Sequence, residues 1–435
     1  MHRRNFLSAS GLGLAALVSR RFAPPWLHTH PDEHFLEDLQ KRCFRYFFEQ
    51  FDRHTGLIRD HARANNLPYP ADQRSAANVT VTGFGLAGYC IAAERGWIGR
   101  ATAEARVLVT LRFFADWAAH RSGWFYHWLD QQSGERSGAI EDTLAESEIS
   151  TIDSAFLLAG VLTVRQYFRS NPEIVVLANR IYERVDFTWM MEKSLILCHG
   201  WTPERGFIMD LWSEYSEASL LYLLAIGSPS HPIPPRAWYA WRRNPNVYGP
   251  YRFIGSAPLF TQQYSHAFVD FRYRREGNGT GVDWFENSIT ATRAHRQFCL
   301  DLAKRFPGYS SEIWGLTCSF GPQGYIDWGG PPLDPRTDGT VVPCAAGGSL
   351  MFASDICLPA LRAMKERFGA QIYGRYGFVD AFNPVTGWVA EEVQGLNLGI
   401  MLLSAENLRT GNVWRWFMSS PEAQRALELA EIRLS

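Results

Sequence analysis

Apolar residues recur at intervals of three and four positions along most of this chain, which is the spacing of amphipathic helices. After Ser150 the apolar positions with this spacing are Ile152, Ala155, Phe156, Ala159 and Leu162. Ser150 and Asp153 also have the spacing of a capping box, so a helix is predicted to begin there. In all, the pattern predicts about a dozen helices. Besides the helix after Ser150, they cover 32–51, 78–95, 100–120, 172–193, 213–227, 234–243, 259–272, 284–306, 345–368 with an interruption at Pro359, 395–409 and 421–434.

The predicted helix over 78–95 contains Gly83, Gly85 and Gly88. Glycine within a helix costs stability unless another segment or a ligand approaches the backbone closely. We therefore expect this helix to be tightly packed against a neighbour.

Gly/Ser-rich apolar helices alternate with ordinary amphipathic ones, and no regular series of Val/Ile-rich strands lies between them. The predicted fold class is therefore all-α, an (α/α)6 toroidal barrel of paired inner and outer helices with long loops. A small hairpin is predicted over 124–136, at the active-site end. Inner helices should begin near residues 78, 151, 214 and 395, with their entry loops gathered at one end.

Two of the predicted helices follow a Ser-Glu sequence. Glu148 lies just before the helix that begins at Ser150, and the stretch SEYSEASLLYLLAIG from Ser213 places Glu214 and Glu217 at a second helix start. Either carboxylate could simply stabilise a helix N-terminus. Two such starts could also present two carboxylates at one mouth, and hydrolysis of a glycosidic bond needs such a pair.

The composition fits a soluble globular protein, with 435 residues, 46% of them hydrophobic, 20% charged, and a formal net charge of −1. A charge near zero gives no reason to expect nucleic acid or an anionic membrane as the partner. Aromatic residues are abundant, at 16 Trp, 17 Tyr and 28 Phe, and some lie in polar, Gly-rich stretches where they could stack on sugar rings or simply fill the core. No Pro/Ser-rich linker divides the chain, so residues 31–435 are predicted to form one domain.

Residues 1–30 have the pattern of a twin-arginine export signal, with Arg3-Arg4 followed by a short apolar run from Ala9 to Val18. The run is too short and too Gly-rich to span a membrane. No Cys follows before Cys43, so a lipid anchor is not expected. The chain is therefore predicted to act in the periplasm or outside the cell.

Several segments together resemble one protein family. They are SEISTIDSAFLLAG, SEASLLYLLAIGSP, QQYSHAFVDFR, WGLTCSFGPQGY with DGTVVPCAA, and ENLRTGNVW, in this order between about residue 34 and about residue 430. This order is similar to the glycoamylase-like family, which includes bacterial endo-β-1,2-glucanases and a related domain of cyclic β-1,2-glucan synthases. The resemblance implies an (α/α)6 barrel that acts on β-linked glucans with no metal and no organic cofactor.

The resemblance places Glu148 and Glu217 at the family's central acidic positions. Further candidates for a catalytic or substrate-orienting role are Glu214, Asp153 and Asp270. Candidates for contacts with the sugar are Trp124, His127, Tyr264, His266, Trp314, Tyr325, Trp328, Asp338 and Glu392, although packing or a turn would explain each one alone. The family often carries Asp where this chain has Phe320, a departure that would change which glucan fits or whether the site cleaves at all.

The leading hypothesis is an exported, monomeric endo-β-1,2-glucanase that uses two carboxylates. One alternative is a transglycosylase with the same site, because the glucanases of the family invert while the synthase domain retains configuration. The other is a non-catalytic glucan-binding protein on the same barrel. Sequence alone leaves the three open.

Overall fold

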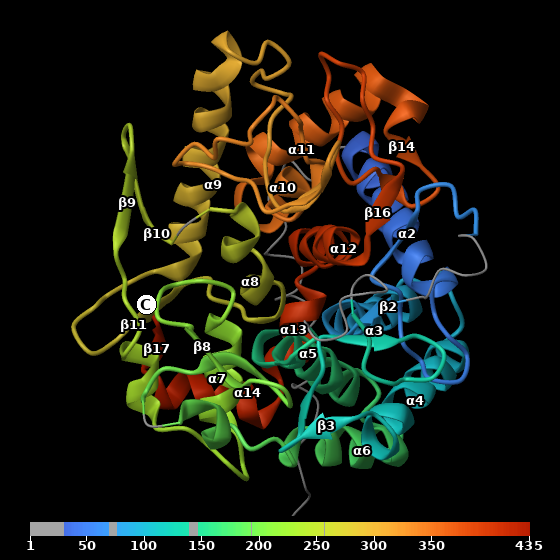
Figure 1. The fold of residues 1–435 in the computed structure, drawn as a ribbon, viewed down its shortest axis with the longest axis vertical. Coiled ribbons are helices and arrows are strands. Elements are labelled where there is room, and N and C mark those ends of the chain that lie inside the picture. The colour runs from blue at the N-terminus through green and yellow to red at the C-terminus, as the bar shows by residue number, and fades with distance from the viewer. Residues whose placement is uncertain (1–29, 69–75, 139–146, 193, 256) are drawn as a thin grey trace, which may run out of the picture.

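The computed structural model describes residues 30–68, 76–138, 147–192, 194–255 and 257–435 (Figure 1). The predicted signal segment lies outside these residues except for His30, which begins the first described helix. The fold is mostly helical, as predicted, and among the described residues no helix is long and apolar enough to cross a membrane. Its α-helices are α2 (His30–Glu49), α3 (Val79–Glu94), α4 (Arg100–Asp116), α5 (Thr151–Tyr167), α6 (Pro172–Glu183), α7 (Ser219–Gly227), α8 (Tyr264–Phe268), α9 (Trp284–Asp301), α10 (Pro343–Gly347), α11 (Leu350–Phe368), α12 (Gly395–Arg409), α13 (Asn412–Met418) and α14 (Pro421–Leu429).

Short 3-10 helices continue or connect several of these elements. They are η3 (Thr188–Met191), η4 (Pro235–Tyr239), η5 (Leu259–Gln262), η6 (Leu302–Lys304) and η7 (Gly369–Gln371).

Short antiparallel strands fix the loops between the helices. One three-stranded sheet joins β6 (Ile149–Ser150), β7 (Cys198–Thr202) and β8 (Gly206–Leu211). The strand pairs are β1 (His61–Arg63) with β16 (Glu392–Gln394), β2 (Ala76–Asn78) with β5 (Trp128–Asp130), β3 (His120–Arg121) with β4 (Trp124–Phe125), β9 (Pro245–Tyr248) with β10 (Tyr251–Ile254), β11 (Arg274–Glu276) with β17 (Ile432–Leu434), β12 (Ser319–Gly321) with β13 (Gly324–Ile326), and β14 (Tyr373–Gly374) with β15 (Gly377–Phe378). Helices α3, α5 and α12 begin directly after β2, β6 and β16, so each of these helix starts is held by a strand pair.

The predicted hairpin over 124–136 is divided between two strand pairs. Trp124–Phe125 pairs with β3, whereas Trp128–Asp130 pairs with β2, and only Leu129 bridges back to Arg136. Local alternation of apolar residues could not reveal this exchange of partners, because β2 lies some fifty residues away in the chain.

The helix boundaries agree with the sequence pattern at three of the four predicted inner helices. Starts near 78, 151 and 395 are confirmed by α3, α5 and α12. The start at 214 is wrong: α7 begins at Ser219 after Ala218, with no side-chain cap, and Glu214 lies in a bridge with Arg242. The interruption predicted at Pro359 is wrong, because Pro359 lies inside α11; this segment is instead divided between α10 and α11 and is kinked at Ala353.

The glycine-rich helix α3 crosses α5 at very short range. A Cβ atom on Gly83 would lie 2.4 Å from the carbonyl oxygen of Phe156, and one on Gly160 would lie 2.3 Å from the carbonyl oxygen of Gly83. Both helices are buried along nearly their whole length. The expected crowding of this helix is therefore confirmed, and glycine is required because two backbones touch.

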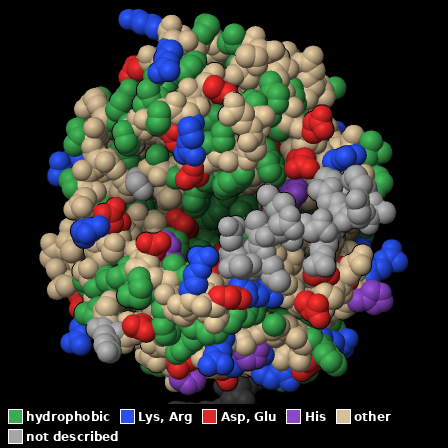
Figure 2. Space-filling model, in the orientation of Figure 1, with side chains coloured by type: hydrophobic (Ala, Val, Ile, Leu, Met, Phe, Trp, Pro, Cys, Tyr) green, Lys and Arg blue, Asp and Glu red, His purple; other side chains and the backbone are tan. Residues whose placement is uncertain are grey.

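Helices α3, α5 and α12 lie near the centre of Figure 1, with α2, α4, α6, α9 and α11 around them. Figure 2, in the same orientation, shows a hollow in the middle of this face, with apolar side chains at its floor and acidic side chains at its rim. The loops and strands that precede the central helices therefore surround a depression.

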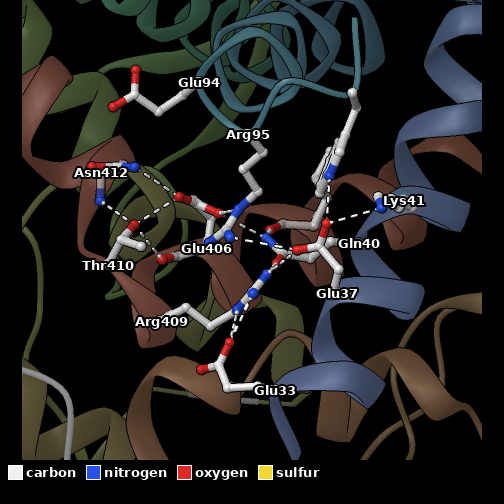
Figure 3. A network of polar contacts seen from close by, with 12 residues as sticks. Glu33, Glu37, Gln40, Lys41, Glu94, Arg95, Glu406, Arg409, Thr410 and Asn412 are labelled. Atoms are coloured by element: carbon white, nitrogen blue, oxygen red, sulfur yellow. Dashed lines mark hydrogen bonds and ion pairs between the residues drawn. The ribbon is translucent and has the colours of Figure 1, made fainter.

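A buried ionic network joins the far ends of the same helices (Figure 3). The carboxylate of Glu406, in α12, is completely buried and accepts hydrogen bonds from Arg95 at 2.6 Å and Gln40 at 2.9 Å. It also accepts from Thr410 at 2.6 Å and Asn412 at 2.9 Å. These donors come from α2, from α13 and from the residues that follow α3 and α12, so one carboxylate connects four segments.

We expect Glu406→Ala to lower the free energy of unfolding by about 3–5 kcal/mol, because it leaves the Arg95 cation buried beside an empty space. Glu366→Ala is the control, since the Glu366 carboxylate pairs with Arg362 on the surface and such pairs contribute little. Urea unfolding of the two variants measures both values. An equal loss in both would mean that the Glu406 network does not hold these helices together.

Candidate active site

The N-terminal ends of α3 and α5 come together at His127. Asn78 caps α3 by accepting from the N–H groups of Thr80 and Val81, and Ser150 caps α5 by accepting from the N–H of Asp153. The predicted capping box at Ser150 is therefore confirmed. Both caps face His127, whose carbonyl accepts from Val79 N–H while its own N–H donates to the carbonyl of Glu148.

His127 lies between two carboxylates. Its Nδ1 is 3.2 Å from Glu148 Oε1, and its Nε2 is 3.4 Å from Asp153 Oδ1. Asp153 also accepts hydrogen bonds from the hydroxyl groups of Thr80 at 2.7 Å and Ser150 at 2.6 Å. Asp153 is therefore held from three sides, whereas His127 is the only side-chain partner that the described residues give Glu148.

Charge interactions determine the protonation of this group. Burial lowers the pKa of His127, but the carboxylates of Asp153 and Glu148 raise it by more, to about 9. Burial likewise raises the pKa of Glu148, and its hydrogen bond with His127 outweighs this and holds that pKa below the usual value. Near neutral pH the site thus contains an imidazolium and an ionised Glu148.

The potential metal-ligand atoms of His127, Glu148 and Asp153 lie within 4.8 Å of one another. Nδ1 of His127 is directed at Glu148. Nε2 lies near both Asp153 Oδ1 and the side-chain nitrogen of Asn78, which is 3.2 Å away. An imidazolium has no free lone pair for a metal. The group therefore fits an internal cation between two anions better than a metal centre.

Glu217 lies in the turn before α7, and its pKa is shifted in the opposite direction from that of Glu148. Its side chain is buried, and Oε2 has no hydrogen-bond partner within the described part of the chain. Burial raises the pKa of Glu217 to about 7, and the charge of Asp153 acts in the same direction. Ser265 fixes the turn, because its hydroxyl donates to the Glu217 carbonyl at 2.5 Å and accepts from Leu220 N–H at 2.9 Å.

Two further carboxylates at the site were missed in the sequence. Asp380 is buried, accepting from Asn397 Nδ2 at 2.8 Å and from Phe320 N–H at 2.6 Å, and burial raises its pKa to about 7. Asp60 lies beside His61, at 3.1 Å, and although burial raises its pKa, this contact keeps the pKa below the usual value. Asp380 could have been noticed as one acidic residue in the apolar run GFVDAF, whereas Asp60 has no such signal.

The remaining acidic candidates are turned away from this group. Glu214 is exposed and pairs with Arg242 at 2.6 Å. Asp270 pairs with Arg272 at 2.8 Å, and that guanidinium lies over the ring of Trp414, beyond the C-terminal end of α12. Asp338 is exposed and accepts from Thr340 N–H at 2.9 Å, which is a local turn. The structure thus gives these three carboxylates other partners.

Several aromatic candidates are core residues. The rings of Trp124, Trp314 and Trp328 are completely buried, so they cannot stack on a ligand as predicted. His266 is also buried, which lowers its pKa to about 3, and its Nε2 lies 3.3 Å from the Tyr215 hydroxyl and 3.2 Å from that of Ser288. It is a structural histidine.

Other candidates lie at the hollow or next to it. Tyr264 is almost buried among Phe84, Phe156 and Phe260 but is close enough to Glu217 for that charge to affect its pKa. Glu392 Oε2 is 4.0 Å from His61 Nε2. Tyr325 is 57% exposed and is the predicted stacking residue that keeps an accessible ring.

Comparisons with known proteins agree with this arrangement. Residues 210–421 match the family described as "Glycoamylase: Putative glucoamylase". The curated exo β-1,2-glucooligosaccharide sophorohydrolase (non-reducing end) of Parabacteroides distasonis is 27% identical over 436 residues, which cover 92% of this chain and 58% of that protein. The present chain thus spans little more than half of that relative.

Two crystal structures are similar over most of the chain. A putative glucoamylase from Bacteroides caccae superposes with a TM-score of 0.85 at 25% identity, covering 93% of this chain and all of that one. A β-1,2-glucanase from Parabacteroides distasonis gives 0.82 at 26% identity, covering 92% and 60%. The predicted resemblance to the glycoamylase-like family is confirmed.

Proposed function

We propose that this protein is a glycoside hydrolase that cleaves β-1,2-linked glucan. The observation that carries the proposal is the contrast between Glu217, buried and with its pKa raised to about 7, and Glu148, ionised beside the His127 cation. Two carboxyl groups with opposed protonation are the acid and base that glycoside hydrolysis requires. The substrate is inferred from the relatives, one named as a β-1,2-glucooligosaccharide hydrolase and one as a β-1,2-glucanase.

In this mechanism Glu217 donates its proton to the glycosidic oxygen as the bond to the anomeric carbon breaks. Glu148 removes a proton from the attacking water or attacks the anomeric carbon itself. His127 keeps Glu148 ionised, and Asp153 orients His127 through its second nitrogen. Asp380 accepts from Asn397 of α12, and because burial also raises its pKa to about 7, it is the second candidate for the proton donor.

We further infer that residues 31–435 form one (α/α)6 toroidal barrel. Six of the described helices, α3, α5, α7, α8, α10 and α12, are buried almost throughout. Except between α7 and α8, where the described helices are the 3-10 helices η4 and η5, they alternate along the chain with α-helices that bury mainly one face, as inner and outer helices of such a barrel would. The carboxylates then lie at the mouth formed by the inner helix starts.

The deciding experiment is incubation of the protein with linear β-1,2-glucan, followed by chromatography of the products. Shorter glucans support hydrolysis, and release of disaccharide alone would indicate exo rather than endo cleavage. Redistributed or cyclised chains would indicate a transglycosylase, and unchanged but bound glucan a binding protein. Parallel incubation with an α-1,4-glucan tests the linkage, since cleavage of that glucan alone would overturn the proposed substrate.

Export through the twin-arginine route is also proposed, on the pattern of residues 1–30. Arg3-Arg4→Lys-Lys should leave the precursor in the cytoplasm while the parent reaches the periplasm. Cell fractionation measures this, and normal export of the variant would exclude that route.

A further inference from the structure

A hairpin on the wall of the site carries an aromatic pair. In the β12–β13 hairpin Phe320 lies directly opposite Tyr325, so both side chains are on one face. Their ring centroids are 6.3 Å apart and nearly perpendicular, at 81°. The ring of His61 meets Phe320 from the other side, with centroids 5.4 Å apart at 74°. We call these three residues the aromatic corner.

The aromatic corner is joined to the acidic groups of the site. The backbone N–H of Phe320 donates to Asp380 Oδ2 at 2.6 Å, and His61 Nδ1 lies 3.1 Å from Asp60 Oδ2. Glu392 Oε2 lies 4.0 Å from the other nitrogen of His61. Carboxylate oxygens thus border the three rings, as acceptors for hydroxyl groups would.

Tyr325 has one end in the site and one face in solvent. Its side chain is 57% exposed, yet its hydroxyl interacts with the Cys318 thiol and is close enough to Asp60 and Asp380 to sense their charges. The hydroxyl of Tyr325 therefore lies among the acidic groups of the site, while the residue remains accessible to a ligand from solvent. The hairpin is held firmly, because Trp328, which is buried, donates its Nε1–H to Ser319 Oγ at 3.1 Å.

We propose that the aromatic corner of His61, Phe320 and Tyr325 is a subsite that binds one glucosyl unit of the glucan, with the Tyr325 ring as its stacking face. The C–H faces of a β-linked glucose ring are apolar and pack against aromatic faces, while its hydroxyl groups reach the bordering carboxylates. Phe320 supports the Tyr325 ring and has no polar group for the sugar. The inference rests on the proposed function, since it takes the ligand to be a glucan.

The test measures binding rather than turnover. In a Glu217→Gln parent, calorimetry gives the Kd of linear β-1,2-glucooligosaccharides of increasing length. Tyr325→Ala and Phe320→Ala should each weaken binding about tenfold. The loss should appear only above the chain length that reaches the aromatic corner, and Tyr325→Phe should retain most of the affinity. Tyr273→Ala is the matched control, because Tyr273 is another exposed tyrosine, at 64%, outside the site.

The outcomes separate this subsite from the proposed function. Equal affinities of the parent and Tyr325→Ala at every length would overturn the subsite, even if the wild type cleaves the glucan. If Tyr325→Ala weakens binding only of the longer glucans but the wild type cleaves none of them, hydrolysis is overturned and the subsite is upheld. If the parent binds no glucan of any linkage and the wild type cleaves none, both are overturned.

Discussion

Glu217→Gln is expected to lower kcat on β-1,2-glucan by about 10²–10⁴-fold, which is the range for loss of a general acid. The amide has nearly the shape of the protonated carboxyl but has no proton to give. The same substitution is expected to stabilise the protein at pH 8. Activity assays together with urea unfolding at pH 5 and pH 8 measure both effects.

The second effect follows from the raised pKa of Glu217, about 7 against a usual 4.5. Between these values the folded protein binds more protons than the unfolded chain, so stability decreases as the pH rises. The favourable contribution is complete below about pH 4.5 and is lost as the pH passes 7. At pH 8 the buried charge costs on the order of 3 kcal/mol, and glutamine removes that cost.

Glu214→Gln is the matched control, three residues away in the same segment. Its carboxylate is exposed and paired with Arg242, so neither kcat nor the pH dependence of stability should change appreciably. Near-wild-type turnover of Glu217→Gln would show that another group protonates the leaving oxygen. Asp380, whose burial also raises its pKa to about 7, would then be the first to test.

The activity of the wild type should fall on both sides of an optimum pH, because one carboxyl group must be protonated and the other ionised. Cleavage needs Glu217 protonated and Glu148 ionised, so activity should decrease as the pH rises through about 7. It should also decrease in acid, below the lowered pKa of Glu148.

Much of the fold could be predicted from the sequence because the inner helices have strong local signals. Ser150 is a cap that the sequence displays, and Gly83 marks a helix crossing. The start of α7 was misplaced because Ser213 and Ser216 resemble caps, while the turn is in fact held by Ser265, which is remote in sequence. Strand pairs such as β1 with β16 join segments more than three hundred residues apart, so no local pattern reveals them.

The site was predictable to the extent that its residues lie next to helix starts. Glu148, Asp153 and His127 do come together, and Glu217 reaches the same mouth. The errors concern burial: Trp124, Trp314 and Trp328 lie in Gly-rich or polar stretches, yet tertiary packing encloses them completely. Asp380 was overlooked for the converse reason, because its apolar surroundings in the sequence suggested core and not chemistry.

Glu148→Gln is expected to lower kcat by about 10²-fold or more and, in contrast to Glu217→Gln, to destabilise the protein near neutral pH. The carboxylate of Glu148 is an anionic partner of the buried His127 cation, and loss of a hydrogen bond to a charged group costs about 1.5–3 kcal/mol. Because the pKa of Glu148 is lowered in the folded state, this contribution is present above about pH 4.5 in the wild type and is lost as the pH falls through the folded pKa. The stability of the variant should therefore approach that of the wild type in acid.

Glu204→Gln is the control for this substitution, because the Glu204 carboxylate pairs with Arg136 at the surface and should affect neither activity nor its pH dependence. If Glu148→Gln loses stability but keeps its turnover, Glu148 only positions His127, and the base is Asp60, whose pKa is also lowered. If it loses turnover and the difference in stability vanishes in acid, the same carboxylate both holds the imidazolium and acts on the water or the anomeric carbon. A loss of stability in Glu148→Gln marks a carboxyl group that the folded protein keeps ionised, and a gain in Glu217→Gln marks one that it keeps protonated. The opposite signs of the two stability changes would then identify base and acid independently of the kinetics.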